Sequence, residues 1–198
     1  MRVIVGIDEV GRGALAGPVV VGLAAVPVNK KLSFPRKLGI LKDSKKLSPK
    51  KRKAWLNYFK QYPDIFFTTA RVYPRGIERL NISKAANEAA LKVFKTISKR
   101  SVSIDSVFLD GGLYLGNSRT GSRTIKNAKT IIKGDEKIMA IKIASIVAKV
   151  TRDDYMIRLS KKYPAYGFDV HKGYGTKVHF QAIRKNGISI VHRKSFCL

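Results

Sequence analysis

Four acidic residues stand at positions where carboxylates can do chemistry. Asp8 and Glu9 end an apolar run, Asp110 ends another, and Asp135 precedes a long helical segment. Any one of them alone is better explained as a strand end or a helix cap. Carboxylates that meet in one place, however, repel one another unless a cation holds them, and hard oxygen ligands suit Mg²⁺ or Mn²⁺. Together the four acids predict a site for divalent cations.

The chain is strongly basic, with 40 Lys and Arg against 13 Asp and Glu and a net charge of +27. Such an excess favours a polyanionic partner. Nucleic acid fits better than an anionic membrane, because the sequence offers no long basic amphipathic helix and no lipidation motif. Carboxylates in so basic a chain indicate phosphodiester chemistry, in which two metal ions activate water and stabilise the leaving oxygen. The alternative is a non-catalytic basic nucleic-acid-binding protein, ribosomal or architectural, which explains the charge but not the placement of the acids.

Zinc and nucleophilic chemistries have less support. The chain has one cysteine, Cys197, and its three histidines, His171, His179 and His192, do not show the spacing of zinc ligands. A serine or cysteine nucleophile with a base and an orienting residue is not indicated either. We interpret each histidine as a structural or phosphate-side residue rather than a catalytic one.

The same inventory bears on the compartment. A single cysteine excludes an internal disulfide framework and fits a reducing environment. Asp8 and Glu9 interrupt the first apolar stretch, which argues against an export signal, and the apolar residues 14–28 are too few to span a bilayer. We therefore expect a cytoplasmic protein that has no membrane partner and is a monomer.

Hydrophobic patterning predicts an α/β fold in which helices flank a mixed β-sheet. Ser48 with Pro49, Ser83 and Thr176 are the expected N-caps of three helices. We expect a catalytic domain over 1–162 and a helical C-terminal region over 163–198, packed on the sheet. The predicted strands cover 2–9, 19–26, 64–74, 104–110 and 128–133, and the predicted helices cover 48–62, 83–99, 137–162 and 176–185.

Several motifs, in the same order along the chain, resemble those of the ribonuclease HII family. The opening run Asp8-Glu9-Val10-Gly11-Arg12-Gly13 is followed by GPVVVGLAAVP, LKDSKKLSPKKR, NISKAANEAAL, LDGG, ASIVAKVTRD and YGFDVHKGYGT. The resemblance implies a ribonuclease H-like sheet with a helical C-terminal region. It also implies an endonuclease that cuts the RNA strand of RNA–DNA hybrids and cuts 5′ of a ribonucleotide embedded in DNA, leaving 3′-hydroxyl and 5′-phosphate ends.

The resemblance also assigns the site. The family's four metal carboxylates fall on Asp8, Glu9, Asp110 and Asp135, which would hold two divalent cations, Mg²⁺ or Mn²⁺. The turn formed by Gly11, Arg12 and Gly13 would read the 2′-hydroxyl of RNA, because glycines let the backbone approach a nucleotide and present its amides. Tyr174 would stack against the sugar at the RNA-to-DNA junction.

Basic residues complete the expected interface. Asp43-Ser44-Lys45-Lys46 resembles the family's DSK segment, which meets the phosphate backbone, so Ser44, Lys45 and Lys46 are expected to bind substrate. Lys142, Ser145, Lys149 and Arg152 share one face of the predicted long helix, because they are spaced by three, four and three residues. That face is either a phosphate-binding stripe or a solvated surface; the family motif favours a phosphate role for Lys149 and Arg152.

The nearest related family is ribonuclease HIII, which shares the sheet and the acids. Members of that family usually carry an additional N-terminal substrate-binding domain. In this sequence Arg2 already begins the first predicted strand, so we expect the HII type.

Overall fold

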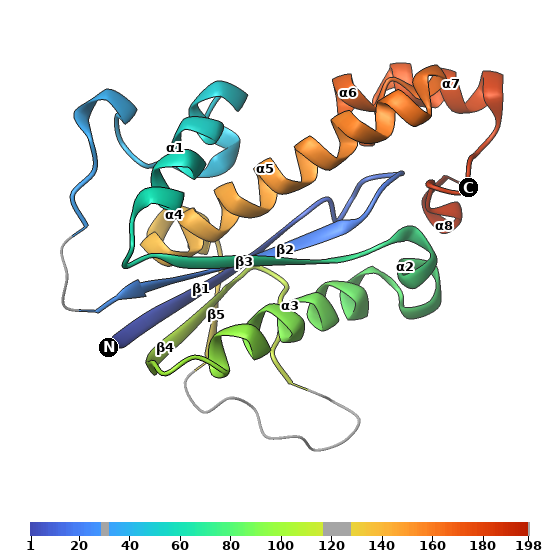
Figure 1. The fold of residues 1–198 in the computed structure, drawn as a ribbon. Helices are drawn as coiled ribbons and strands as arrows, with labels where there is room; N and C mark the ends of the chain where they lie inside the picture. Colours follow the sequence, from blue (N-terminus) through green and yellow to red (C-terminus); the bar gives the residue numbers. More distant parts are fainter. Residues whose placement is uncertain (29–31, 117–127, 198) are drawn as a thin grey trace.

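The computed structural model describes residues 1–28, 32–116 and 128–197, and its centre is a five-stranded mixed sheet between two helical layers (Figure 1). Across the sheet the strand order is β3-β2-β1-β4-β5. All five predicted strands are confirmed, with ends that differ by a few residues. They are β1 (Arg2–Val10), β2 (Val19–Pro27), β3 (Phe66–Val72), β4 (Ser103–Asp110) and β5 (Ala128–Ile131).

The direction of the central strands brings chain segments of distant sequence to one edge. β1 pairs antiparallel with β2, and β2 with β3, whereas β1, β4 and β5 run parallel. Ile7 of β1 pairs with Leu109 of β4, so the next residues, Asp8 and Asp110, lie side by side near the carboxyl ends of neighbouring strands. Ligands gather at the carboxyl edge of parallel strands.

Helices cover both faces of the sheet. α3 lies on one face, whereas α5 and α1 lie on the other, and the C-terminal helices follow at the far end of α5 (Figure 1). Among the described residues, no helix is long and apolar enough to cross a membrane. The helices are α1 (Pro49–Gln61), α2 (Pro74–Leu80), α3 (Ile82–Ser98), α4 (Gly134–Lys137), α5 (Met139–Lys162), α6 (Phe168–His171), α7 (Lys177–Asn186) and α8 (Lys194–Cys197).

Three details of the helices differ from the sequence-based expectation. The cap of α3 is Asn81, whose side chain accepts from the Lys84 amide, and not Ser83. α2 was not predicted, although Pro74 at its first turn is a typical start signal. The expected helix 137–162 begins at Met139, because Ile138 has an extended backbone that separates it from the short helix α4.

Two apolar cores hold α5 and α3 against the sheet. In strands, alternate residues face opposite sides. Val3, Val5 and Ile7 of β1 therefore pack toward α3, in the same core as the alanines of that helix. On the other face Gly6 allows α5 to approach closely: a Cβ at this position would lie 2.2 Å from the carbonyl carbon of Ala140. The absence of a side chain at Gly6 therefore sets how closely α5 packs against the sheet.

Candidate metal centre and substrate pocket

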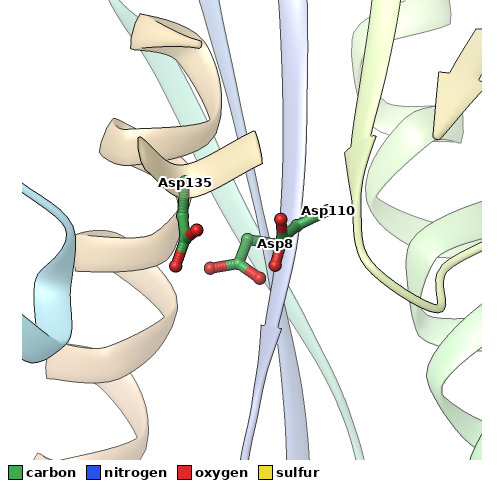
Figure 2. Close-up of side chains that lie close together, drawn as sticks. All are labelled: Asp8, Asp110 and Asp135. Carbon is green, nitrogen blue, oxygen red and sulfur yellow. The ribbon is translucent and has the colours of Figure 1, made fainter. Parts of the chain in front are cut away.

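Three carboxylates from distant parts of the sequence point toward one another at the carboxyl edge of the sheet (Figure 2). Asp8 comes from β1, Asp110 from the end of β4, and Asp135 from α4. One oxygen of each lies within 4.8 Å of the others. The sequence-based prediction that these three acids meet is confirmed.

Backbone amides orient two of these side chains. The amide of Gly134, at the start of α4, donates to Asp110 Oδ1 at 2.7 Å, and the amide of Glu9 donates to Asp8 Oδ1 at 2.7 Å. The first bond ties the end of β4 to the helix that carries Asp135. The cluster is therefore held by main-chain groups that a side-chain substitution leaves in place.

Glu9 lies beside the three aspartates and not within their cluster. It follows Asp8 in a strand, so the two side chains leave opposite faces. Glu9 Oε1 is 3.5 Å from Arg12 Nη1, whereas Glu9 Oε2 is buried and has no hydrogen-bond partner in the described part of the chain. Its role as a fourth metal ligand stays a prediction.

Burial and mutual repulsion raise the pKa values of several carboxyl groups at this site. Burial raises the pKa of Asp8 well above its usual value, and the carboxylates of Glu9, Asp110 and Asp135 add to the rise, while a hydrogen bond from Ser145 opposes it. Burial also raises the pKa of Glu9 and of Asp135, again with Asp110 adding to the rise. Buried carboxylates of this kind, together with the unpartnered Glu9 oxygen, fit a divalent cation, which would favour their charged forms.

A pocket of about 340 Å³ opens beside Asp8. Within it the hydroxyls of Ser44 and Ser145 lie 2.8 Å apart. Six of the predicted site residues line this pocket, so residues that sequence reasoning assigned to separate motifs share one cavity. Its lining consists of Asp8, Glu9, Val10, Ser44, Lys45, Ser145, Lys149 and Tyr174.

The basic residues of the DSK segment differ in their surroundings. Lys45 is exposed, and its Nζ lies 3.6 Å from Asp135 Oδ2. Partial burial lowers the pKa of Lys45, but the carboxylates of Asp135 and Asp43 outweigh this and raise it. Lys46 is also exposed and pairs with Glu136 at 2.7 Å, outside the residues that line the pocket.

Comparisons with known proteins agree with this geometry. The family model described as Ribonuclease HII matches residues 5–198. The Ribonuclease HII of Chlamydia pneumoniae is 44% identical over 98% of this chain and 83% of its own length. The chain belongs to the ribonuclease HII family.

Solved structures show the same fold. The ribonuclease H2 of Pyrococcus horikoshii OT3 superposes with a TM-score of 0.73 at 24% identity, covering 98% of this chain and 95% of that one. The RNase HII of Archaeoglobus fulgidus, solved in a complex with PCNA, gives a TM-score of 0.70 at 26% identity, covering 98% and 93%. The predicted ribonuclease H-like fold is confirmed.

Membership of the ribonuclease HII family decides the class of activity. The protein is an endoribonuclease that cleaves RNA strands, and the alternative of a non-catalytic basic protein is not favoured. The acidic cluster is compatible with the use of divalent metal. The role of Glu9 and the number of cations stay predictions.

Arg152 requires a correction. Its side chain is fully buried, and its guanidinium donates to the carbonyl oxygens of Pro18, Ala16 and Lys172. It therefore does not present its charge to a phosphate, and the expected phosphate contact is wrong for this residue. The helical face that it shares with Lys149 is buried at Arg152, because the β1–β2 connection covers this part of α5.

The glycine-containing turn of the ribonuclease HII motif follows β1 directly. Gly11 has φ +85°, which favours glycine, and a Cβ there would lie 2.1 Å from Arg152 Nε. The Arg12 side chain reaches Ser83 Oγ at 2.8 Å as well as Glu9. Sequence reasoning missed Arg193, whose guanidinium contacts this turn from the C-terminal region. No local pattern marks a contact between residues 182 positions apart.

The three histidines lie together in the C-terminal region, away from the carboxylates. Ser189 donates to His192 Nδ1, so the proton of His192 is on Nε2, which donates to His179 Nε2 at 3.1 Å. His179 Nδ1 in turn donates to the Tyr174 carbonyl at 3.0 Å. Burial lowers the pKa of His171 and His192, and that of His179 to about 4, which keeps the cluster neutral. Their interpretation as structural residues agrees with these contacts.

Proposed function

We propose that the protein cuts the RNA strand of RNA–DNA hybrids and also cuts 5′ of single ribonucleotides embedded in duplex DNA. The bond broken joins the phosphorus to the 3′ oxygen, so hydrolysis leaves 3′-hydroxyl and 5′-phosphate ends. The observation that carries this proposal is the meeting of Asp8, Asp110 and Asp135 beside a pocket that is also lined by two lysines and a tyrosine.

We propose two divalent cations, Mg²⁺ or Mn²⁺, as cofactors, held by Asp8, Asp110 and Asp135 with Glu9 as the fourth ligand. Bound cations of this type activate water and stabilise charge on the leaving oxygen. The chain places the carboxylates: two strands and one helix hold them in a largely buried site. The buried Glu9 oxygen without a hydrogen-bond partner in the described part of the chain would be stabilised there by a bound cation.

The pocket supplies candidate contacts for the nucleic acid. Lys45 and Lys149 line it, and their ammonium groups are the proposed phosphate contacts nearest the carboxylates; Lys46 would meet the backbone farther out, and Ser44 would donate its hydroxyl. Tyr174 lines the same pocket, and two cationic groups lie near its ring, with Lys149 Nζ 5.7 Å and Arg152 Cζ 5.1 Å from the ring centre. In this proposal the half-buried ring stacks against the sugar at the RNA-to-DNA junction.

The 2′-hydroxyl would be read by the turn of Gly11, Arg12 and Gly13. Gly13 is exposed, and a Cβ at this position would meet no atom within 4 Å, so a nucleotide can approach the backbone closely. A hydroxyl both donates and accepts, so main-chain groups can distinguish RNA from DNA at this point. In this proposal the carboxylates hold the cations that promote hydrolysis, and the turn selects the phosphodiester.

The test is incubation with Mg²⁺ and a DNA duplex that contains one ribonucleotide, with products separated on a denaturing gel. We expect incision at the 5′ side of the ribonucleotide. Asp110→Asn should reduce the rate at least about 100-fold, or about 3 kcal/mol of transition-state stabilisation. The matched control is Asp169→Asn, which alters an exposed acid of α6 outside the cluster.

Two results would count against the proposal. Absence of incision by the wild-type protein with both Mg²⁺ and Mn²⁺ would contradict the activity. Undiminished incision by Asp110→Asn would contradict the assignment of the site. An all-DNA duplex of the same sequence should remain intact in every reaction.

A further inference from the structure

Two buried arginines hold the segment that joins β1 to β2. Arg152 of α5 and Arg193 of the C-terminal region are both fully buried, and all three nitrogens of each guanidinium donate to main-chain carbonyls. Of the six carbonyls, five belong to residues 11–18. Burying a charged group is costly unless it is fully hydrogen-bonded, so this arrangement is a built feature of the fold.

Arg193 contacts the turn itself. Its Nη2 donates to the Gly11 carbonyl at 2.7 Å, its Nη1 to the Arg12 carbonyl at 2.8 Å, and its Nε to the Gly17 carbonyl at 3.1 Å. A planar guanidinium fixes the directions of these bonds as well as their lengths. The backbone of the turn is thus held from beneath at two successive peptide groups.

These contacts determine where the turn's amides point. In a planar trans peptide, the carbonyl of one residue and the N–H of the next point in opposite directions. Since the carbonyls of Gly11 and Arg12 face Arg193, the N–H groups of Arg12 and Gly13 face away from it. Neither of these amides has a backbone partner in the described part of the chain. They are therefore free to donate to a ligand.

Arg152 links the same segment to Tyr174. It donates to the carbonyls of Ala16 and Pro18 and also to that of Lys172, two residues before the tyrosine. Ala14 and Tyr174 form an antiparallel bridge, which adds a second connection. The segment that follows the turn and the tyrosine are consequently fixed relative to each other by the Arg152 side chain and by this main-chain bridge.

The charge beneath the turn is present at neutral pH. Burial and the neighbouring Arg152 lower the pKa of Arg193 to about 9, which still leaves the guanidinium protonated near pH 7. A positive charge bonded to the carbonyls polarises the two peptide groups and makes their N–H groups stronger donors.

We propose that Arg193 is a positioning residue: with Arg152, it orients the Arg12 and Gly13 amides toward the sugar of the substrate and so sets the preference for a ribonucleotide over a deoxyribonucleotide. This inference rests on the proposed function of the turn. It gives the C-terminal region a role in selectivity, because Arg193 reaches the turn across 182 residues of sequence.

The experiment compares Arg193→Lys with the parent protein, both carrying Asp110→Asn so that the substrate stays intact. The affinities for two duplexes are measured by fluorescence anisotropy: one duplex contains a single ribonucleotide and the other is all DNA. For the parent we expect about tenfold tighter binding of the first, the contribution of one or two hydrogen bonds. Arg193→Lys should bring this ratio at least threefold closer to one, while the affinity for all-DNA duplex changes less than twofold.

Arg184→Lys is the matched control, because it makes the same exchange at an exposed position of α7. It should leave both affinities unchanged. An unaltered ratio in Arg193→Lys would overturn the proposal, and so would an equal loss of affinity for both duplexes, since that is the effect of general disturbance. A parent protein without preference would overturn it as well.

A second measurement tests the orientation of the turn without reference to activity. ¹⁵N relaxation of the free wild-type protein should give order parameters near 0.85 for the Arg12 and Gly13 amides, as for rigid backbone, and values below about 0.6 would overturn the proposal even if Arg193→Lys does not fold. In a folded Arg193→Lys protein the same amides should become more mobile. If the wild-type protein does not cut but these amides are rigid, the result contradicts the proposed function and leaves the positioning of the turn by Arg193 uncontradicted.

Discussion

At the scale of single residues, the site brings together carboxylates whose burial and mutual repulsion disfavour their charged forms. Asp8 is buried between Asp110 and Asp135, and the pKa of its carboxyl is raised. A raised carboxyl pKa means that the folded state binds protons more tightly than the unfolded state. The free energy of unfolding therefore falls as pH rises across the window between the two pKa values, and at neutral pH the ionised cluster opposes folding.

Asp8→Asn should accordingly stabilise the metal-free protein. Removing the buried charge leaves the accepting oxygen for the Glu9 amide in place. We expect the Tm in EDTA to rise by about 2–4 °C, which corresponds to about 1 kcal/mol for a chain of this size. The same variant should lose most of the rise in Tm that Mn²⁺ gives the wild-type protein. Differential scanning calorimetry checks both; a lower Tm in EDTA would contradict the assigned charge repulsion.

At the scale of elements, the site depends on the distance between α5 and the sheet. α4 carries Asp135 and leads directly into α5, so any displacement of the start of α5 moves this carboxylate relative to Asp8. Gly6 and Gly22 permit the close approach: a Cβ at Gly22 would lie 2.4 Å from the Ala144 carbonyl oxygen. Two glycines in neighbouring strands therefore have a role in assembling the metal centre.

Gly6→Ala should lower the free energy of unfolding by about 1–3 kcal/mol, the usual cost of forcing an additional methyl group into a packed interface. The added Cβ meets backbone atoms, which cannot rotate away. Urea denaturation measures the effect. Gly13→Ala is the comparison: its Cβ enters open space and its φ is not in the left-handed region, so stability should be nearly unchanged. Equal stabilities of the two variants would contradict the packing argument.

At the scale of the whole molecule, the net charge of +27 governs encounter with nucleic acid. The metal centre gathers several of the 13 acids, whereas lysines such as Lys45 and Lys149 border the pocket. Attraction to phosphates is independent of base sequence and weakens as counterions compete. Under the proposed function, the charge would bring the duplex to the protein, and the turn and the carboxylates would then act on the ribonucleotide.

Binding to an all-DNA duplex should therefore depend steeply on salt. If about six phosphates are neutralised, the affinity should fall about 10³-fold between 50 and 200 mM NaCl, with a slope of log K against log salt near −5. Lys149→Gln should reduce the magnitude of this slope by about one, whereas Lys99→Gln, at the end of α3, should change it less. Fluorescence anisotropy over a salt series provides the slopes; a salt-independent affinity would contradict the electrostatic account.

Local sequence signals were sufficient to predict the strands, most of the long helices and the acids of the site. Apolar runs predicted all five strands, and Ser48 and Thr176 were identified correctly as helix caps, because these signals are local. Local signals were less complete where two compete: Asn81 caps α3 in place of Ser83, and the extended Ile138 divides the predicted long helix. The motifs in their order indicated the family without any tertiary information.

The three-dimensional packing was needed to show which side chains meet and in which direction they point. The parallel pairing of β1 and β4 places Asp8 beside Asp110, while the alternation of strand residues turns Glu9 aside. Helical spacing put Arg152 on one face with Lys149, but it could not show that this part of the face is covered by the β1–β2 connection. Arg193, which contacts Gly11 and Arg12, illustrates the physical reason. Contacts between distant segments depend on how the elements pack, and no periodic sequence pattern marks them.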